Sequence, residues 1–189
     1  MGLSTTVYTG LKLIEGSTFD PDTGIIQVNG ELFQPINPVV SPFINPYFPG
    51  RAEGITEGVY YYDYSWDFFN RGYGTYGNWR RRLAQKLNYT EWAKNSELHP
   101  AREGAPFYEL IQFSDCEGTL GPKVCAKLSQ DFDKMRDVIC SRAELGAPGL
   151  TVDQILEEVH WFDDQVEIYD LWASALKIAA NHNGMISFA

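Results

Sequence analysis

The stretch TVDQILEEVHWFDDQVEIYDLWASALKIAANH, residues 151–182, decides the fold of the C-terminal third of this chain. Apolar residues recur along it every three or four positions, which is the spacing of one face of an α-helix. The recurring residues are Val152, Ile155, Val159, Phe162, Val166, Tyr169, Trp172, Leu176 and Ala179. Thr151 and Gln154 form a capping box, which favours a helix start at this point. We therefore predict either one helix of about 30 residues or two helices separated by a kink.

A second apolar stripe precedes this stretch and predicts another helix, which Pro122 is suited to begin. Its members are Val124, Leu128, Phe132, Met135 and Ile139. Gly146 and Pro148 separate the two helical segments. Residues 151–189 carry one basic and seven acidic side chains, so the long segment is expected to present an acidic face to water.

The N-terminal third predicts strands instead of helices. We expect strands within Thr5–Ile14 and Gly58–Phe69, and a hairpin that joins Ile25–Val28 to Glu31–Gln34. Asn29-Gly30 lies between the hairpin strands and suits a type I′ turn, in which both central residues need a positive φ. The fold class is therefore α+β: an N-terminal antiparallel β-sheet with a hairpin, packed against C-terminal helices that include one long acidic helix.

We expect one domain over residues 1–189, with residues 1–70 mainly β and residues 71–189 mainly α. Shorter elements complete the prediction: a helix over Tyr76–Leu87, a short helix from Thr90 and a buried strand over Phe107–Phe113.

Residues 35–50 form a proline-rich arm that holds five of the ten prolines. Proline removes backbone donors, so this arm is not a central strand. Its apolar content is too high for a flexible linker. The arm therefore either lines the core or contacts a second copy of the chain, which makes a homo-oligomer one expectation.

Charge and composition exclude several classes of protein. The 15 basic and 25 acidic residues give a net charge of −10, which opposes binding to nucleic-acid polymers and to anionic membranes. No apolar run reaches the roughly 18 residues of a membrane-spanning helix. The N-terminus lacks the features of a secretory signal, and the three cysteines form no CxxC pair. We expect a cytoplasmic protein without a cofactor or a resident metal.

The first candidate site lies in Val59–Trp79, where ten of 21 residues are aromatic. The segment Arg71–Gly77 reads as a glycine-rich turn that leads into a helix N-terminus, where free amides favour an anion. The candidate ligand-binding residues here are Tyr73, Tyr76, Asn78, Trp79 and Arg80. Arg80, Arg81 and Arg82 form the one basic cluster, which would suit a small anion or would be a solvated helix face. The alternative to a binding site is a tight turn whose aromatic side chains only pack against the rest of the protein.

The second candidate site is Phe113–Gly118, with the sequence FSDCEG. In an extended backbone, Asp115 and Glu117 project to the same side. Two carboxylates placed in this way can hold a divalent cation, act as an acid/base pair, or accept hydrogen bonds from a ribose or a base. They can also simply cap the next turn and pair with arginines.

Three segments resemble a family of small uncharacterised phage and prophage proteins. They are YDYSWDF (62–68), GYGTYGNWRRRLA (72–84) and PFYELIQFSDCEGTLGPKVCAKLSQDF (106–132). The resemblance covers roughly residues 60–140 and supplies no mechanism. It implies a role against host defence, through binding a protein or sequestering a nucleotide signal in the host cytoplasm.

Three functions follow from these observations. The leading hypothesis is a soluble protein that binds a small nucleotide-like molecule: the aromatic residues stack on the base, Arg80 neutralises charge, and Asp115 and Glu117 accept hydrogen bonds. The second is a hydrolase of a phosphoester or glycosidic bond, with Asp115 and Glu117 as its catalytic groups. The third is a protein–protein inhibitor that uses the acidic C-terminal helix.

Overall fold

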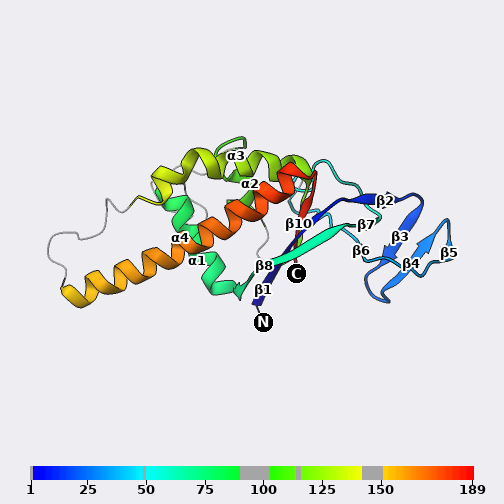
Figure 1. Ribbon diagram of the computed structural model, residues 1–189, viewed down its shortest axis with the longest axis horizontal. Helices are drawn as coiled ribbons and strands as arrows, with labels where there is room; N and C mark the ends of the chain where they lie inside the picture. The colour runs from blue at the N-terminus through cyan, green and yellow to red at the C-terminus, as the bar shows by residue number, and fades with distance from the viewer. Residues whose placement is uncertain (1, 49, 90–102, 114–115, 142–150) are drawn as a thin grey trace.

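The computed structural model describes residues 2–48, 50–89, 103–113, 116–141 and 151–189 (Figure 1). Its central sheet has four antiparallel strands in the order β8-β1-β10-β9. They are β8 (Tyr64–Gly72), β1 (Gly2–Thr9), β10 (Met185–Phe188) and β9 (Gly118–Leu120). The sheet therefore joins segments from both ends and the middle of the chain.

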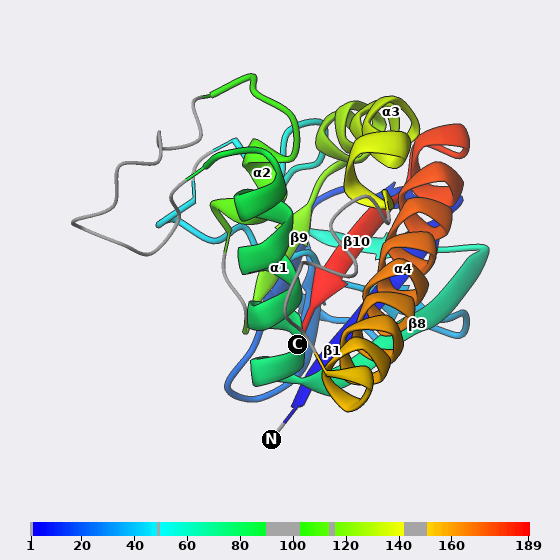
Figure 2. The ribbon, with the colours of Figure 1, turned by 90° about the vertical axis from the view of Figure 1, so that its left-hand side faces the viewer.

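The helices cover one face of this sheet. They are α1 (Tyr73–Lys86), α2 (Tyr108–Ile111), α3 (Pro122–Ile139) and α4 (Val152–Asn181). Along β1, every second residue from Leu3 to Thr9 is buried, while the residues between them are partly exposed. This alternation is the pattern of a strand with one face on a core. Figure 2 shows α1, α3 and α4 arranged around the strands β1 and β10.

Trp172 of α4 lies at the centre of the core and contacts rings from three other elements. Its ring centroid is 5.0 Å from that of Phe68 on β8, 5.7 Å from Tyr76 and 5.9 Å from Trp79 on α1, and 5.6 Å from Phe188 on β10. The aromatic excess of the sequence is therefore largely used to pack the helices against the sheet.

A second region, here called the β lobe (residues 11–41), projects from the central sheet toward the right in Figure 1. It contains β2 (Lys12–Ile14), β3 (Ser17–Asp20), β4 (Ile25–Val28), β5 (Glu31–Leu32) and β6 (Val39–Val40). Strands β2 and β6 pair with β7 (Val59–Tyr61), whereas β3, β4 and β5 form a sheet of their own. None of residues 11–41 is buried.

The structure confirms the α+β class and several of its elements. The acidic segment is one helix of 30 residues, α4. The Asn29-Gly30 turn is also confirmed, because both residues have positive φ, 53° and 84°, and Val28 pairs with Glu31 across the turn. Helix α3 begins at Pro122, as expected.

The expected buried strand over Phe107–Phe113 is wrong, because this segment contains the short helix α2. Phe107 has a left-handed backbone with φ of 58°, and its N–H donates to the Asp131 carboxylate at 2.9 Å. The apolar residues Phe107, Leu110 and Ile111 are buried at helical spacing. A short apolar run fits the period of a helix as well as that of a strand, and here tertiary contacts select the helix.

Other boundaries also differ from expectation. Gly10, with φ of 68°, ends β1, so that Thr5–Ile14 contributes two strands instead of one. The segment Gly58–Phe69 is likewise divided between β7 and β8. Strand β10 was not expected at all, and the expected helix from Thr90 lies outside the described residues. Within the part of the chain that the structure describes, no helix has the length and apolar character needed to cross a membrane.

Candidate functional site

The glycine-rich segment Arg71–Gly77 is not a turn, which corrects the expectation for the first candidate site. It forms the end of β8 and the first residues of α1. A Cβ atom built on Gly74 or Gly77 would meet nothing within 4 Å. Within the described structure, therefore, no neighbouring group comes so close that either position requires glycine.

Helix α1 turns Tyr76, Trp79 and Arg80 into the core, where all three are buried. The Tyr76 and Trp79 rings stack on Trp172 with interplanar angles of 26° and 13°. These ring faces contact protein, so the structure does not offer them to a ligand.

The other candidate residues of α1 lie nearer the surface. Tyr73 is half-buried and Asn78 is exposed. The Asn78 side-chain oxygen accepts a hydrogen bond of 3.0 Å from Arg81. Of the five candidate residues in this motif, only these two present side chains to solvent.

Arg80 joins the two sequence motifs. Its guanidinium donates a hydrogen bond of 2.6 Å to the carbonyl oxygen of Phe113, the first residue of the FSDCEG segment. Arg51, also buried, donates to the neighbouring carbonyl of Gln112 at 2.7 Å. Two buried guanidiniums therefore fix consecutive peptide groups at the start of the second motif, which sequence spacing alone did not predict.

The second motif is only partly described, since Asp115 lies outside the described residues. Cys116 and Glu117 are exposed. The Asn45 side chain, from the proline-rich arm, donates a hydrogen bond of 3.3 Å to the Glu117 carbonyl oxygen. Gly118 follows with φ of +135°, and a Cβ at this position would lie 2.6 Å from the Phe113 ring. Gly118 therefore lies tightly against the Phe113 ring, while the Glu117 side chain is exposed.

A partly buried ionic network that the sequence did not reveal holds α2 to α3. The Lys127 ammonium lies 2.8 Å from the Asp131 carboxylate and 2.5 Å from that of Glu109. Asp131 also accepts the Phe107 N–H. The role of this network is structural, because the bonds of Lys127 and Asp131 fix either the left-handed turn at Phe107 or the helix α2 that follows it. The i,i+4 spacing of Lys127 and Asp131 was the available signal.

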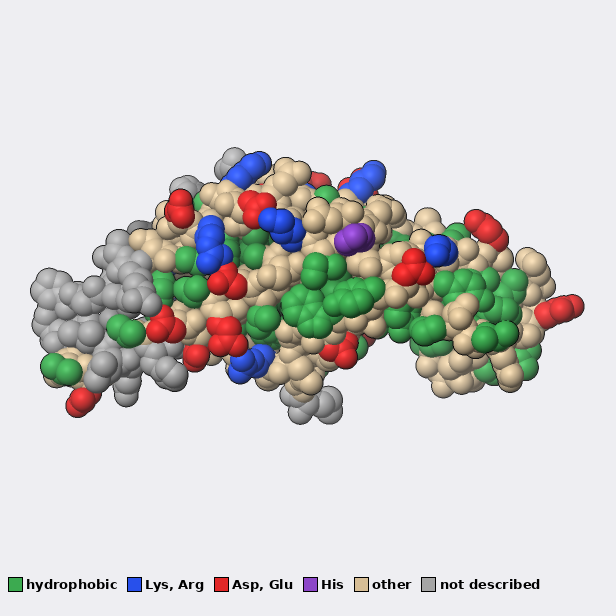
Figure 3. Space-filling model, in the orientation of Figure 1, with side chains coloured by type: hydrophobic (Ala, Val, Ile, Leu, Met, Phe, Trp, Pro, Cys, Tyr) green, Lys and Arg blue, Asp and Glu red, His purple; other side chains and the backbone are tan. Residues whose placement is uncertain are grey.

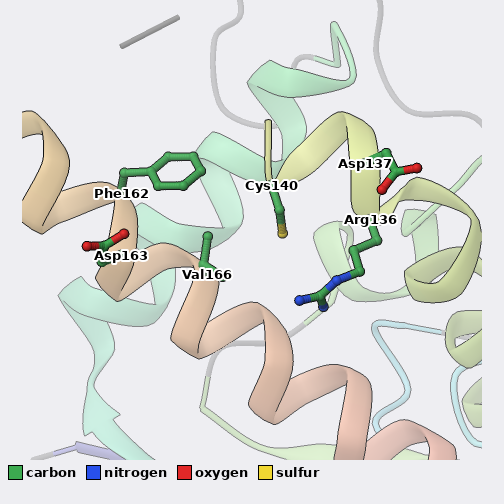
Figure 4. Close-up of a pocket in the computed structure, with 6 residues that line it drawn as sticks. All are labelled: Arg136, Asp137, Cys140, Phe162, Asp163 and Val166. Carbon is green, nitrogen blue, oxygen red and sulfur yellow. The ribbon is translucent and has the colours of Figure 1, made fainter. Parts of the chain in front are cut away.

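A groove of about 360 Å³ lies between the end of α3 and α4 (Figure 4). Its lining residues are Arg136, Asp137, Cys140, Phe162, Asp163 and Val166. The Arg136 guanidinium forms an ion pair with Asp170, which ties α3 to α4 and raises the pKa of the arginine. Burial raises the pKa of the Cys140 thiol, so it is protonated at neutral pH and is a poor nucleophile.

The β lobe carries five of the ten exposed large hydrophobic side chains of the described residues. Leu32 is 69% exposed and Ile36 is 98% exposed, and Ile25 is also exposed. Figure 3 shows apolar side chains gathered at this end of the molecule. Ile25 and Gln27 lie on the outward face of β4, since Ile26 and Val28, which alternate with them, are partly buried. Leu32 of β5 shares this face because it pairs with Gln27. The sequence signalled only the Ile36 part of this surface, through the unusual apolar content of the proline-rich arm.

Comparisons of this chain with protein-family models, with curated proteins and with solved structures gave no match.

Proposed function

We propose that this protein is a subunit that associates with further copies of itself through the β lobe. The observation that supports this proposal is the exposure of Leu32 and Ile36 on a region in which no residue is buried. Monomeric proteins rarely keep contiguous apolar patches in contact with water. Burying one such side chain completely contributes about 1.5–3 kcal/mol, so a few of them suffice to favour association.

The construction of the β lobe supports the same proposal. Its outer sheet, β3-β4-β5, has only three short strands, and the apolar side chains on its outward face have no covering layer within the described chain. Sheets usually bury one face against another layer. A second copy would provide that layer, and the proline-rich arm that follows β5 would contribute Ile36 to the contact.

Sedimentation velocity over about 1–100 μM protein tests this proposal, since this range covers weak to moderate self-association. The wild type is expected to shift from monomer to larger species as its concentration rises. The variant Ile36→Asp is expected to remain monomeric. Val138→Asp makes the same kind of change at a half-exposed position on α3 and should behave like the wild type. A wild type that stays monomeric throughout would refute the proposal.

A second proposed function is the binding of a small nucleotide-like molecule, in the setting of a phage protein that sequesters a host defence signal. The hydrogen bond from Arg80 to Phe113 favours it, because this bond brings α1 and the FSDCEG segment together. Among the described residues, Tyr73, Asn78 and Glu117 remain accessible candidates for contact with a ligand. Asp115, outside the described residues, stays a candidate from the sequence. Tyr76, Trp79 and Arg80 would support this site from the core.

Calorimetry against a panel of linear and cyclic nucleotides tests the second function. Binding should be weakened in Glu117→Gln and Asp115→Asn, and retained in Glu31→Gln, which changes an exposed carboxylate of the β lobe. Turnover of the ligand by the wild type, lost in the same two variants, would indicate the hydrolase instead. No heat from any member of the panel would contradict both ideas.

A further inference from the structure

We propose that two copies of the chain join through the outer edge of β5, so that their two β3-β4-β5 sheets become one continuous sheet. This contact rests on the proposed association through the β lobe and specifies its strand and its register. Three features lead to β5: the direction of its backbone groups, its place at the end of the sheet, and the exposed apolar side chains beside it.

The backbone groups of Leu32 point away from the rest of the sheet. Leu32 pairs with Gln27 of β4, and the next residue, Phe33, donates its N–H to the Ile26 carbonyl oxygen at 2.9 Å. In an antiparallel ladder, successive residues direct their N–H and C=O groups to alternate sides of the strand. Since Phe33 faces β4, the N–H and C=O of Leu32 face the outer edge. Within the described residues, neither group has a hydrogen-bond partner.

Strand β5 is also the open edge of its sheet. It ends the sheet at the tip of the molecule (Figure 1), whereas the opposite edge, β3, is tied to β7 by a hydrogen bond of 2.8 Å from the Val59 N–H to the Ser17 hydroxyl. The edges of the central sheet are less suited to pairing. Strand β8 has a bulge opposite Thr5 and Thr6, and β9 is buried throughout. Bulges and coverage block edge pairing, and the described residues provide neither of them at β5.

Leu32 is the centre of the proposed contact. A two-fold axis at this residue places the two copies of Leu32 opposite each other as a hydrogen-bonded pair. Each Leu32 N–H then donates to the Leu32 carbonyl oxygen of the other copy, so that groups without partners in one chain satisfy each other. Such a contact is self-complementary, as a two-fold interface requires. It uses β5 of both copies and therefore stops at two chains.

The same register covers the two most exposed apolar side chains of the β lobe. Leu32, which is 69% exposed, lies beside Leu32 of the other copy. Ile36, which is 98% exposed and follows Leu32 by four residues, comes beside the turn that precedes β5 in the other copy. Pro35 has no N–H to donate and so ends the pairing before Ile36.

The register keeps like charges apart, although the β lobe is acidic. Glu31 lies opposite Phe33 of the other copy and not opposite Glu31. Asp20 belongs to β3, and β4 separates β3 from β5. The contact therefore avoids the pair of like charges that destabilises neighbouring strands.

Edge pairing and the covering layer of the proposed association are compatible, because they use different surfaces of the β lobe. The joined sheet presents Ile25 and Leu32 of both copies on one face. A second dimer that packs its own joined sheet on this face supplies the layer. Dimers form through the edge, and larger species form through the face.

Amide hydrogen exchange of the wild type, measured residue by residue by mass spectrometry, tests the edge contact without any substitution. The Leu32 amide should exchange about tenfold more slowly in concentrated, associated protein than in dilute protein, because the second copy gives it an acceptor. The Phe33 amide is the internal control. It is bonded to Ile26 within one chain and should be protected at both concentrations.

A proline at position 32 removes the donor of the contact. Leu32→Pro should leave the hairpin intact, because an edge strand tolerates proline where the missing N–H would face solvent. Leu32→Ala is the matched control, since it also removes the side chain but keeps the N–H. In sedimentation velocity, Leu32→Ala should weaken dimerisation by about tenfold or less, whereas Leu32→Pro should abolish it over about 1–100 μM protein. Protection of the Phe33 amide in Leu32→Pro verifies the hairpin.

The outcomes distinguish the edge contact from association through the β lobe in general. If Ile36→Asp blocks association but Leu32→Pro, with its hairpin intact, dimerises as well as Leu32→Ala, the edge contact is wrong and the proposed association stands. A Leu32 amide that exchanges equally fast in dilute and in associated wild type overturns the edge contact in the same way, and it decides alone if the proline loosens the hairpin. A wild type that stays monomeric overturns both proposals.

Discussion

The guanidinium of Arg80 and the carbonyl oxygen of Phe113 are joined by a hydrogen bond of 2.6 Å, although 33 residues separate them in the chain. Arg80 is a fully buried residue of α1, and its guanidinium also lies 5.0 Å from the centroid of the Tyr76 ring. The bond is therefore a buried, charge-assisted contact that positions the start of the second sequence motif.

Replacing Arg80 by leucine should lower the free energy of unfolding by about 3 kcal/mol, because the Phe113 carbonyl loses a charged donor in a buried setting. Urea unfolding followed by tryptophan fluorescence measures this change. Arg81→Leu, one position further along α1 and exposed, should change stability by no more than about 0.5 kcal/mol. Equal effects of the two substitutions would show that Arg80 has no special structural role.

Removing the central ring should be among the costliest changes in the core. Trp172→Ala should lower the free energy of unfolding by about 4 kcal/mol, since it leaves a large cavity among rings from α1, β8 and β10. Within the described residues the buried Trp172 indole nitrogen has no hydrogen-bond partner, so Trp172→Phe should cost less than half as much. Denaturant unfolding compares the two variants. A Phe variant as unstable as the Ala variant would contradict this account.

Two glycines should respond in opposite directions to alanine. Gly77 lies within α1 with open space around its Cβ position, so Gly77→Ala should stabilise the protein by about 0.5–1 kcal/mol. At Gly121 a Cβ would lie 2.5 Å from backbone atoms of Ala52 and Glu53, so Gly121→Ala should be strongly destabilising. Thermal unfolding measures both effects. Loss of stability in Gly77→Ala would indicate that the segment needs glycine for a reason that the helix does not show.

Stability should fall in alkaline solution, and Cys125 should contribute to the fall. Burial raises the pKa of its thiol from 9.0 to about 12 in the folded protein. Above the pKa of the unfolded chain, the unfolded thiol loses its proton while the folded thiol keeps it, so the unfolded state is favoured as pH rises. The contribution of this one group is about 1.4 kcal/mol per pH unit between the two pKa values.

Urea unfolding under reducing conditions between about pH 8 and pH 11 measures this dependence. The slope should be smaller in Cys125→Ala, although that variant is less stable at neutral pH because it leaves a small cavity. Burial also raises the pKa of Tyr169, so part of the slope should remain in the variant. An unchanged slope in Cys125→Ala would contradict the assignment.

The elements predicted well from sequence are those whose local signals agree with their packing. The apolar stripes of α3 and α4 continue for several turns, so the helical period is unambiguous there. Asn29-Gly30 suits a turn with two positive φ angles, which few other residue pairs can form. Phe107–Phe113 was misassigned because its few apolar residues fit both helix and strand, and a distant carboxylate, Asp131, determines its start. Strand β10 has four residues, too few for any period to identify.

The candidate site was harder to predict because the same side chains pack cores and stack on ligands. Tyr76 and Trp79 lie three residues apart on α1, which places both on the inward face of the helix. Arg80 follows them inward, although arginine is seldom fully buried, and only the structure reveals the carbonyl that accepts its hydrogen bond. The exposure of Ile36 depends equally on the absence of a covering layer, which a sequence does not state.

The position of β10 between β1 and β9 has a consequence for synthesis on the ribosome. Strand β1 is made before its two neighbours and can pair with β8 once residue 72 has emerged, but its other edge waits for residues 185–188. Between the synthesis of β8 and that of β10 the nascent chain therefore displays an open strand edge beside an incomplete aromatic core, which is an aggregation-prone state. Closure of the sheet is a late, long-range step, so we expect slow folding and dependence on chaperones during synthesis.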